Sequence, residues 1–382
     1  MHPMLKPALR RAWRGRNTVQ FGVTPAHAVK VGPLDIATGS FLELLDGTRG
    51  LPLLREEARA LDLSDRHVNT LLDRLTRAGL LDDPRAGGPE ADALRRRADA
   101  LERQRSDAAS LSVVHPGPGD GVRRLAARRA MRVRVRGAGR VGASVAALLS
   151  ASGVGRVDVL DGGRTEPWDV APGGLPASAV GERRDTAARQ LVRRSAADGA
   201  ARLPDGPDGA DGHAPGLSLV VLAPREGLDV YAPDPDAAAP WLTGGVPHLY
   251  AGVIEATGVV GPLVLPGGTG CARCLALGRA DQDPQWPRMT AQWRSSRRRD
   301  PVPACDLSLA TAVAGLAASH ALAFLDGELP ASTGTRWEAA LPLLDWRSER
   351  IAPHPDCPCG AHGPARTEPL SEVAVPQDTM AG

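Results

Sequence analysis

The 382-residue chain has few aromatic residues, few cysteines and no long apolar run. Only 3% of its residues are aromatic, and no stretch of about 18 consecutive apolar residues could cross a bilayer. The basic segment 1–25 lacks the apolar core of a signal peptide. Five cysteines do not indicate a disulfide framework, and a formal charge of +2 gives no argument for a nucleic-acid partner. We therefore expect a cytoplasmic protein of two or three domains, without a membrane segment.

Short amphipathic patterns near the N-terminus predict a small helical module. After the segment Leu34–Gly47, they cover Leu51–Leu61, Ser64–Ala78 and a stretch that ends at Asp83. Ser64 is a suitable N-cap for a helix, and Gly79 is a suitable residue to end it. Short helices joined by tight turns, with Arg77–Leu81 leading into a hairpin, predict a winged-helix domain over residues 1–83.

Glycine and proline clusters divide the rest of the chain. The charged segment Glu90–Arg105 predicts a connector helix within residues 84–121. We expect the second domain over residues 122–364 and a disordered tail over 365–382. The division predicts two folded units of unequal size, joined by helix.

A glycine loop opens the second domain. In RVRVRGAGRVGASVAALLS (Arg132–Ser150), a strand pattern runs into Gly137, Gly139 and Gly142 and then into a helix pattern. Strand, Gly-x-Gly-x-x-Gly and helix are the order that a nucleotide-binding βαβ unit requires, because the helix N-terminus presents amides to phosphate. Asp161, 19 residues beyond Gly142, ends the next strand and is placed to accept ribose hydroxyls. Tight helix–sheet packing without a ligand is the alternative.

Four of the five cysteines form two close pairs. These pairs are Cys271 with Cys274 and Cys357 with Cys359. Two thiolate pairs can complete a closed tetrahedral zinc site, which would clip the end of the chain onto the domain. The alternative is four unliganded thiols, and His354 or His362 could replace one ligand.

These features together resemble the ThiF/MoeB/HesA family, the bacterial relatives of ubiquitin-activating enzymes. The resemblance covers residues 124–360 and rests on the glycine loop with Asp161, on residues 246–275 and 304–327, and on the second cysteine pair. It implies an α/β, Rossmann-like nucleotide-binding domain with structural Zn²⁺ and bound ATP and Mg²⁺. It also implies that a peptide or ubiquitin-like C-terminal carboxylate attacks the α-phosphate of ATP. We further expect a homodimer.

The chain departs from that family where charge must be met on the phosphates. Family members carry an Asn-Leu-x-Arg-Gln pattern, then a Lys, and later an Asp that helps to hold magnesium. None of these occurs here, and Arg140 stands in the loop where glycine is common. The residues that could stand in are Arg164, Asp169, Arg183 and Arg184. After the strand Leu217–Pro224, Glu226 and Asp229 come too late unless the loop shifts, so the use of ATP and Mg²⁺ stays open.

Cys305 is the cysteine outside the two pairs, and it aligns with a cysteine that family members carry ahead of a helix. It is a candidate acyl-accepting thiol, because a helix N-terminus can lower a thiol pKa. A small, buried residue at a helix start is the alternative interpretation. The apolar helix Leu307–Leu325 is expected to be core or dimer interface, and its His320 a buried structural histidine.

The N-terminal module resembles the PqqD-like elements that precede ThiF-like domains in pathways for modified ribosomal peptides, where an edge strand pairs with a leader peptide. Three hypotheses follow. The first is an ATP-dependent adenylyltransferase that uses Cys305, Arg183 and Arg184. The second is a docking protein that binds a leader peptide for a separate enzyme and has lost adenylation. The third is a winged-helix DNA-binding regulator, which the balanced local charge disfavours.

Overall fold

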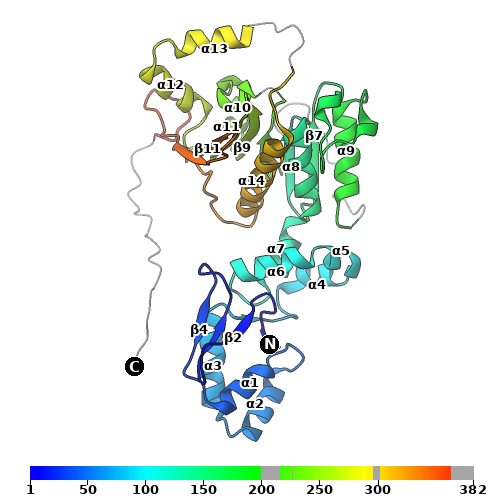
Figure 1. The fold of residues 1–382 in the computed structure, drawn as a ribbon, viewed down its shortest axis with the longest axis vertical. Coiled ribbons are helices and arrows are strands. Elements are labelled where there is room, and N and C mark those ends of the chain that lie inside the picture. Colours follow the sequence, from blue (N-terminus) through cyan, green and yellow to red (C-terminus); the bar gives the residue numbers. More distant parts are fainter. Residues whose placement is uncertain (199–215, 226, 296–301, 363–382) are drawn as a thin grey trace.

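The computed structural model describes residues 1–198, 216–225, 227–295 and 302–362. Figure 1 shows an N-terminal domain, a layer of short helices and a larger α/β domain, arranged along the long axis. The tail predicted over residues 365–382 lies outside the described residues.

The N-terminal domain consists of a small sheet followed by three helices. The strands β2 (Arg11–Trp13), β3 (Val19–Phe21) and β4 (Val29–Val31) form an antiparallel sheet in that order. The helices are α1 (Ile36–Glu43), α2 (Leu51–Ala60) and α3 (Asp65–Arg77). Val19, Phe21, Phe41, Leu54 and Leu75 are buried in their shared core.

The hairpin predicted after the third helix is wrong. Strand β5 (Leu81–Asp82) pairs instead with β1 (Met4–Leu5), so the chain closes on its own beginning. The helix ends follow local rules: the Ser64 hydroxyl accepts a hydrogen bond from His67 N at 3.2 Å, and Gly79 adopts φ +69°. Local capping is therefore readable from the sequence, whereas the pairing of short strands is not.

A helical layer connects this domain to the rest. It contains α4 (Gly88–Arg95), α5 (Ala98–Arg103), α6 (Arg105–Val114) and α7 (Asp120–Arg128). The single connector helix expected over Glu90–Arg105 is interrupted between α4 and α5. Lys6 of the N-terminal domain is only 2% exposed, and its Nζ donates to the carbonyls of Ser112 and Pro116. Burial lowers the pKa of Lys6, and these two acceptors compensate for its lost hydration.

The α/β domain is built on a mixed, seven-stranded sheet. Its strand order is β12-β11-β10-β9-β8-β6-β7. The parallel part contains β6 (Arg132–Arg136), β7 (Arg156–Leu160), β8 (Leu219–Leu222) and β9 (His248–Ile254). The antiparallel part contains β10 (Thr257–Val264), β11 (Thr335–Ala340) and β12 (Arg347–Arg350).

Helices cover both faces of this sheet. One core includes residues of α8 (Arg140–Ala151), α9 (Arg184–Ser195) and α14 (Leu307–Leu325). Elements that pack elsewhere are α10 (Leu228–Tyr231), α11 (Pro235–Thr243), α12 (Ala272–Gln282) and α13 (Trp286–Ser295). Two 3₁₀ turns, η1 (Pro167–Asp169) and η2 (Ala177–Ala179), lie between β7 and α9. The α/β class expected from the sequence is confirmed.

Helix α14 is the one helix in the described ranges that is long and apolar enough to span a membrane, but core helices meet the same criteria. Leu309, Val313 and Ala317 on α14 belong to the main core and are fully buried. Its contacts with α8, β9 and β10 agree with the expected core helix.

A buried ion pair joins the helical layer to α14. Arg128 Nε and Nη2 donate to Asp326 Oδ1 and Oδ2 at 2.8 and 2.6 Å, and both side chains are about 5% exposed or less. Such a bidentate pair satisfies both charges without water.

We predict that Asp326→Asn lowers the free energy of unfolding by about 3–5 kcal/mol, because Arg128 would remain buried without a counter-charge. Urea unfolding followed by circular dichroism measures this loss. Asp345→Asn, which removes an exposed carboxylate 3.7 Å from Arg347, is the matched control and should change stability by less than about 1 kcal/mol. Equal effects of the two substitutions would contradict the prediction.

Candidate functional site

The three glycines of the loop do different work. A Cβ on Gly137, which has φ +102°, would lie 1.9 Å from the carbonyl oxygen of Ala223, and one on Gly142 would lie 2.1 Å from that of Gly137. Both glycines are therefore required by packing alone. Gly139 faces a pocket instead, and the nearest atom to a Cβ there would be Arg225 Cγ at 3.4 Å. Gly139 is also the N-cap of α8 and makes no side-chain cap.

Asp161 ends β7 beside the loop, as the sequence predicts, but its carboxylate is already engaged. Oδ2 accepts from Ala138 N at 2.8 Å, and Oδ1 accepts from Gly163 N and Arg184 Nε at 2.9 Å each. Its side chain is 8% exposed. A ribose could reach this carboxylate only after Arg184 moved, so the predicted sugar contact is not prepared in this structure.

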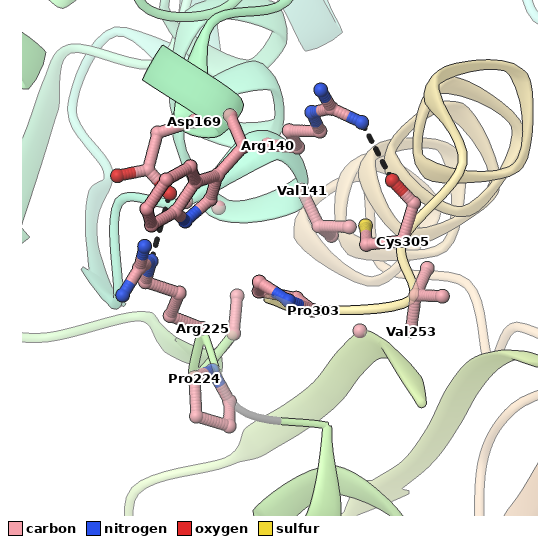
Figure 2. A pocket seen from close by; sticks show the side chains of 13 residues that line it. Arg140, Val141, Asp169, Pro224, Arg225, Val253, Pro303 and Cys305 are labelled. Carbon is pink, nitrogen blue, oxygen red and sulfur yellow. Dashed lines mark hydrogen bonds and ion pairs between the residues drawn. The ribbon is translucent and has the colours of Figure 1, made fainter. Parts of the chain in front are cut away.

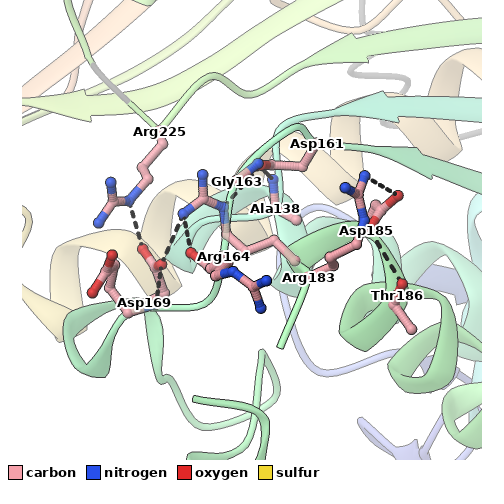
Figure 3. A network of polar contacts seen from close by, with 11 residues as sticks. Ala138, Asp161, Gly163, Arg164, Asp169, Arg183, Asp185, Thr186 and Arg225 are labelled. Carbon is pink, nitrogen blue, oxygen red and sulfur yellow. Dashed lines mark hydrogen bonds and ion pairs between the residues drawn. The ribbon is translucent and has the colours of Figure 1, made fainter. Parts of the chain in front are cut away.

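A chain of ion pairs continues from Asp161 along the carboxyl edge of the sheet (Figure 3). Arg184 Nη1 contacts Asp169 Oδ2 at 3.3 Å, and Arg225 Nε donates to Asp169 Oδ1 at 2.8 Å. Asp169 also accepts from the backbone N–H of Glu166 at 2.9 Å. All the acceptor oxygens in this chain are therefore paired within the protein.

The other two candidate arginines lie outside this chain. Arg183 is exposed and forms an ion pair with Asp185 at 3.1 Å, which raises the pKa of Arg183. Arg164 is exposed and donates to the carbonyl of Gly181 at 2.8 Å. Of the predicted cationic residues, Arg184 and Arg140 lie beside the glycine loop.

A pocket with an empty volume of about 430 Å³ lies in front of Gly139 (Figure 2). The charged residues that line it are Arg140, Asp169 and Arg225, and Trp168, Val253 and Cys305 complete its walls. Arg140 Nη1 donates to the Cys305 carbonyl at 2.6 Å, so this guanidinium lies along the wall. The Arg225 guanidinium lies over the Trp168 ring, 5.7 Å from its centroid.

Cys305 lies at the pocket, but its thiol is not activated in the expected direction. Burial raises its pKa, an effect that the nearby Arg140 charge only partly opposes. The expected lowering by the helix N-terminus is therefore wrong here, because Cys305 precedes the N-cap Asp306 and the carboxylate of that residue holds the first amides of α14.

The residues at this edge do not fit Mg²⁺. Arg225 follows β8, the strand after which the family resemblance implies a metal-binding Asp, and it brings a positive charge there. Asp169, the carboxylate in the pocket lining, has both oxygens paired with guanidinium groups. Asp229 lies exposed on α10 and does not line the pocket, and Glu226 lies outside the described residues. Magnesium would meet a guanidinium instead of an oxygen ligand.

Sequence reasoning missed Arg225 and Trp168. The available signal was position: a charged residue three residues beyond β8 falls where ligands bind in open α/β sheets. Its partner Asp169 lies 56 positions earlier in the chain, so the ion pair itself was not readable.

The four paired cysteines meet in one cluster, as predicted. All four Sγ atoms lie within 4.8 Å of one another. The contacts from Cys271 to Cys274, from Cys271 to Cys357 and from Cys274 to Cys359 measure 3.9, 3.7 and 3.6 Å. A tetrahedron of Zn–S bonds of about 2.3 Å has S–S edges of about 3.8 Å, so the cluster fits Zn²⁺.

Neither candidate histidine joins the cluster. His354 Nε2 pairs with Asp281 Oδ2 at 2.8 Å, and His362 is exposed. A hydrogen bond from the Cys271 thiol lowers the pKa of Cys274 to about 4, which favours the thiolate form that binds metal. A four-thiolate site is closed, so the zinc implied here is structural.

The sheet order, the glycine loop and the cysteine cluster define an α/β domain of the Rossmann-like, nucleotide-binding type with a metal clip. The sequence pattern of the ThiF family matches residues 118–202 and 234–359, more than half of the chain. The chain therefore belongs to the ThiF family.

Solved structures with the same fold cover nearly the whole chain. Crystal structures of E. coli MccB match with a TM-score of 0.67 and 15% identity, and cover 94% of this chain and 99% of MccB. MccB in complex with N-formylated MccA, described as a microcin C7 biosynthetic enzyme, matches with a TM-score of 0.66, 15% identity and coverages of 94% and 100%. PaaA matches with a TM-score of 0.65, 16% identity and coverages of 91% and 99%. The comparison with curated proteins finds no match.

We predict that replacing Cys271 and Cys274 together by Ser releases one equivalent of zinc and lowers the free energy of unfolding by more than about 3 kcal/mol. Metal analysis of the purified protein and thermal unfolding measure the two effects. Cys305→Ser is the matched control and should keep its zinc. Full metal content in the double variant would refute the clip.

Proposed function

We propose that this chain is a peptide-binding member of the ThiF family that recognises a leader peptide through its N-terminal domain and does not carry out magnesium-dependent adenylation. The observation that carries this proposal is Arg225, whose guanidinium is paired with Asp169 where a magnesium ligand is implied. The engaged carboxylate of Asp161 supports it further.

The peptide site follows from the backbone of the small sheet. Arg14 N donates to Thr18 O and Gly22 N to Arg10 O, so even-numbered residues of β3 bond to β2. Alternation along an antiparallel ladder then directs the odd-numbered residues of β3 towards β4. Lys30, opposite Gln20, therefore turns its N–H and C=O to the free edge of β4. An extended peptide can add a strand there.

The comparisons support a peptide partner. Several of the matching structures contain MccB together with MccA or its variants, and the match extends over more than nine-tenths of this chain. The similarity therefore includes the N-terminal domain and the helical layer. It is a similarity of fold at 15% identity, and the partner of this chain remains part of the proposal.

Adenylation of a peptide or ubiquitin-like carboxyl terminus is the second candidate. Gly139 and the uncapped N-terminus of α8 favour it, because they leave amides available to a phosphate. Crystals of MccB with ATP show that a protein of this fold binds that nucleotide. The ATP cofactor thus fits the loop but meets no magnesium ligand.

A DNA-binding role has less support. Asn69 on α3, a residue that would read bases, accepts a hydrogen bond from Arg55 at 3.1 Å, and Arg59 pairs with Asp65. The expected homodimer and cytoplasmic location stay predictions.

We predict that Lys30→Pro weakens leader binding at least about 10-fold, because proline removes the outward N–H of β4 without touching the bonds between β3 and β4. Fluorescence anisotropy with the labelled leader of the precursor peptide encoded beside this gene measures the affinity. Lys30→Ala keeps the backbone donor and is the matched control. Equal affinities of the two variants would exclude the β4 edge.

ATP–pyrophosphate exchange separates the two candidate functions. With Mg²⁺, ATP and the same precursor peptide, we expect no exchange above the rate without enzyme, because no described carboxylate is free to hold the metal at the pocket. Exchange that depends on the precursor would establish the adenylyltransferase and overturn the proposed docking role.

A further inference from the structure

The pocket in front of Gly139 contains buried hydrogen-bond donors that have no acceptor among the described residues. They are Arg225 Nη2, Trp168 Nε1 and Arg140 Nε. A buried N–H without a partner is costly, and three of them around one pocket are uncommon in a native structure. Their presence indicates that the pocket is built to receive acceptor atoms.

Protein acceptors at the pocket are already committed. Asp169 accepts from Arg225 and Arg184, and Asp161 accepts from Arg184 and two backbone amides. The carbonyl of Cys305 accepts from Arg140 Nη1. A ligand rich in donors, or a metal cation, would thus find no free carboxylate in this lining.

The charge of the lining selects the kind of ligand. Two guanidinium groups and one carboxylate leave one net positive charge on Arg140, Arg225 and Asp169. A singly charged oxyanion balances that charge, whereas a triphosphate carries several negative charges and would need a further cation. Figure 2 shows the two arginines on different sides of the pocket, so both can approach one ligand group. The uncapped N-terminus of the 12-residue helix α8 adds a positive end at Gly139.

We propose that this pocket is a metal-independent oxyanion site, in which Arg225, Arg140 and Trp168 bind a singly charged carboxylate or phosphate ester. The guanidinium of Arg225 takes the place that a magnesium ion is implied to hold in the family. The inference rests on the part of the proposed function that denies Mg²⁺ a place, and it adds a ligand at a site separate from the β4 edge.

The test uses the full-length, zinc-loaded protein and ligand-observed NMR or calorimetry, with Mg²⁺ either omitted or added. The probes are N-acetylglycine for a carboxylate, dimethyl phosphate for a phosphate ester, and N-acetylglycinamide as the neutral match. We expect one or both anions to bind equally with and without Mg²⁺, and the amide not to bind. Which anion binds more tightly identifies the source of the oxyanion. Binding of neither anion, or binding only with Mg²⁺, would overturn the proposal.

Two substitutions assign the binding to these residues. Arg225→Gln should weaken the anion at least about 10-fold, because it removes a charge-assisted donor. Trp168→Phe keeps the ring and removes only Nε1, so it should weaken binding several-fold even if the first variant folds poorly. Arg189→Gln, an exposed arginine paired with Asp185 on α9, is the control and should bind as wild type. Wild-type affinity in both Arg225→Gln and Trp168→Phe would refute the assignment.

The two proposals fail in different ways. Loss of anion binding in Arg225→Gln with unchanged leader affinity would support a pocket independent of docking. Pyrophosphate exchange in the wild type would overturn the proposed function, whereas absence of exchange together with absence of anion binding would overturn this inference alone.

Discussion

The buried carboxylate of Asp169 determines how three segments meet at the carboxyl edge of the sheet. It lies in η1, and it holds Arg184 at the start of α9 and Arg225 just beyond β8. With its side chain 3% exposed, this charge would be unstable without such partners. Because Arg184 also reaches Asp161, the same network reaches the glycine loop. The shape of the pocket and the loss of free carboxylates are therefore two results of one set of ion pairs.

A guanidinium at this edge changes the chemistry that the fold can support. An aspartate at position 225 would lie beside Asp169, and two close carboxylates require a cation between them. Arg225 supplies that positive charge covalently. It can hold an oxyanion by directed hydrogen bonds, but it cannot bridge phosphate oxygens and polarise them as a coordinated metal does. The ThiF fold is thus kept, while the means for stabilising a pentacovalent phosphate is missing from the described edge, as expected when function depends on the site and not on the fold.

How far the sequence predicts the structure depends on the range of the interaction. Ser64, Gly79, the glycine loop and the acid that ends β7 follow rules that act within a few residues, and these predictions agree with the structure. The cysteine pairs also carry enough spacing information for the cluster to be expected. The three-residue strands β2 to β4 were not foreseen, since such short segments show no clear alternation. Arg225 and Asp169 are joined only by the tertiary fold, so their pairing and the engagement of Asp161 could not be read from the chain.

Helix α14 gives the pocket a fixed relation to the N-terminal domain. Its first turn follows Cys305, whose carbonyl holds Arg140, and its 19 residues span about 28 Å to Asp326. There Asp326 binds Arg128 of α7, and the same helical layer receives Lys6 from the N-terminal domain. Each junction is a buried charge with more than one hydrogen bond, so a change of angle at any of them would expose or orphan that charge. A peptide held at the β4 edge therefore stands at a set distance from the pocket. The path between them is bridged by the peptide's own length, and not by movement of the domains.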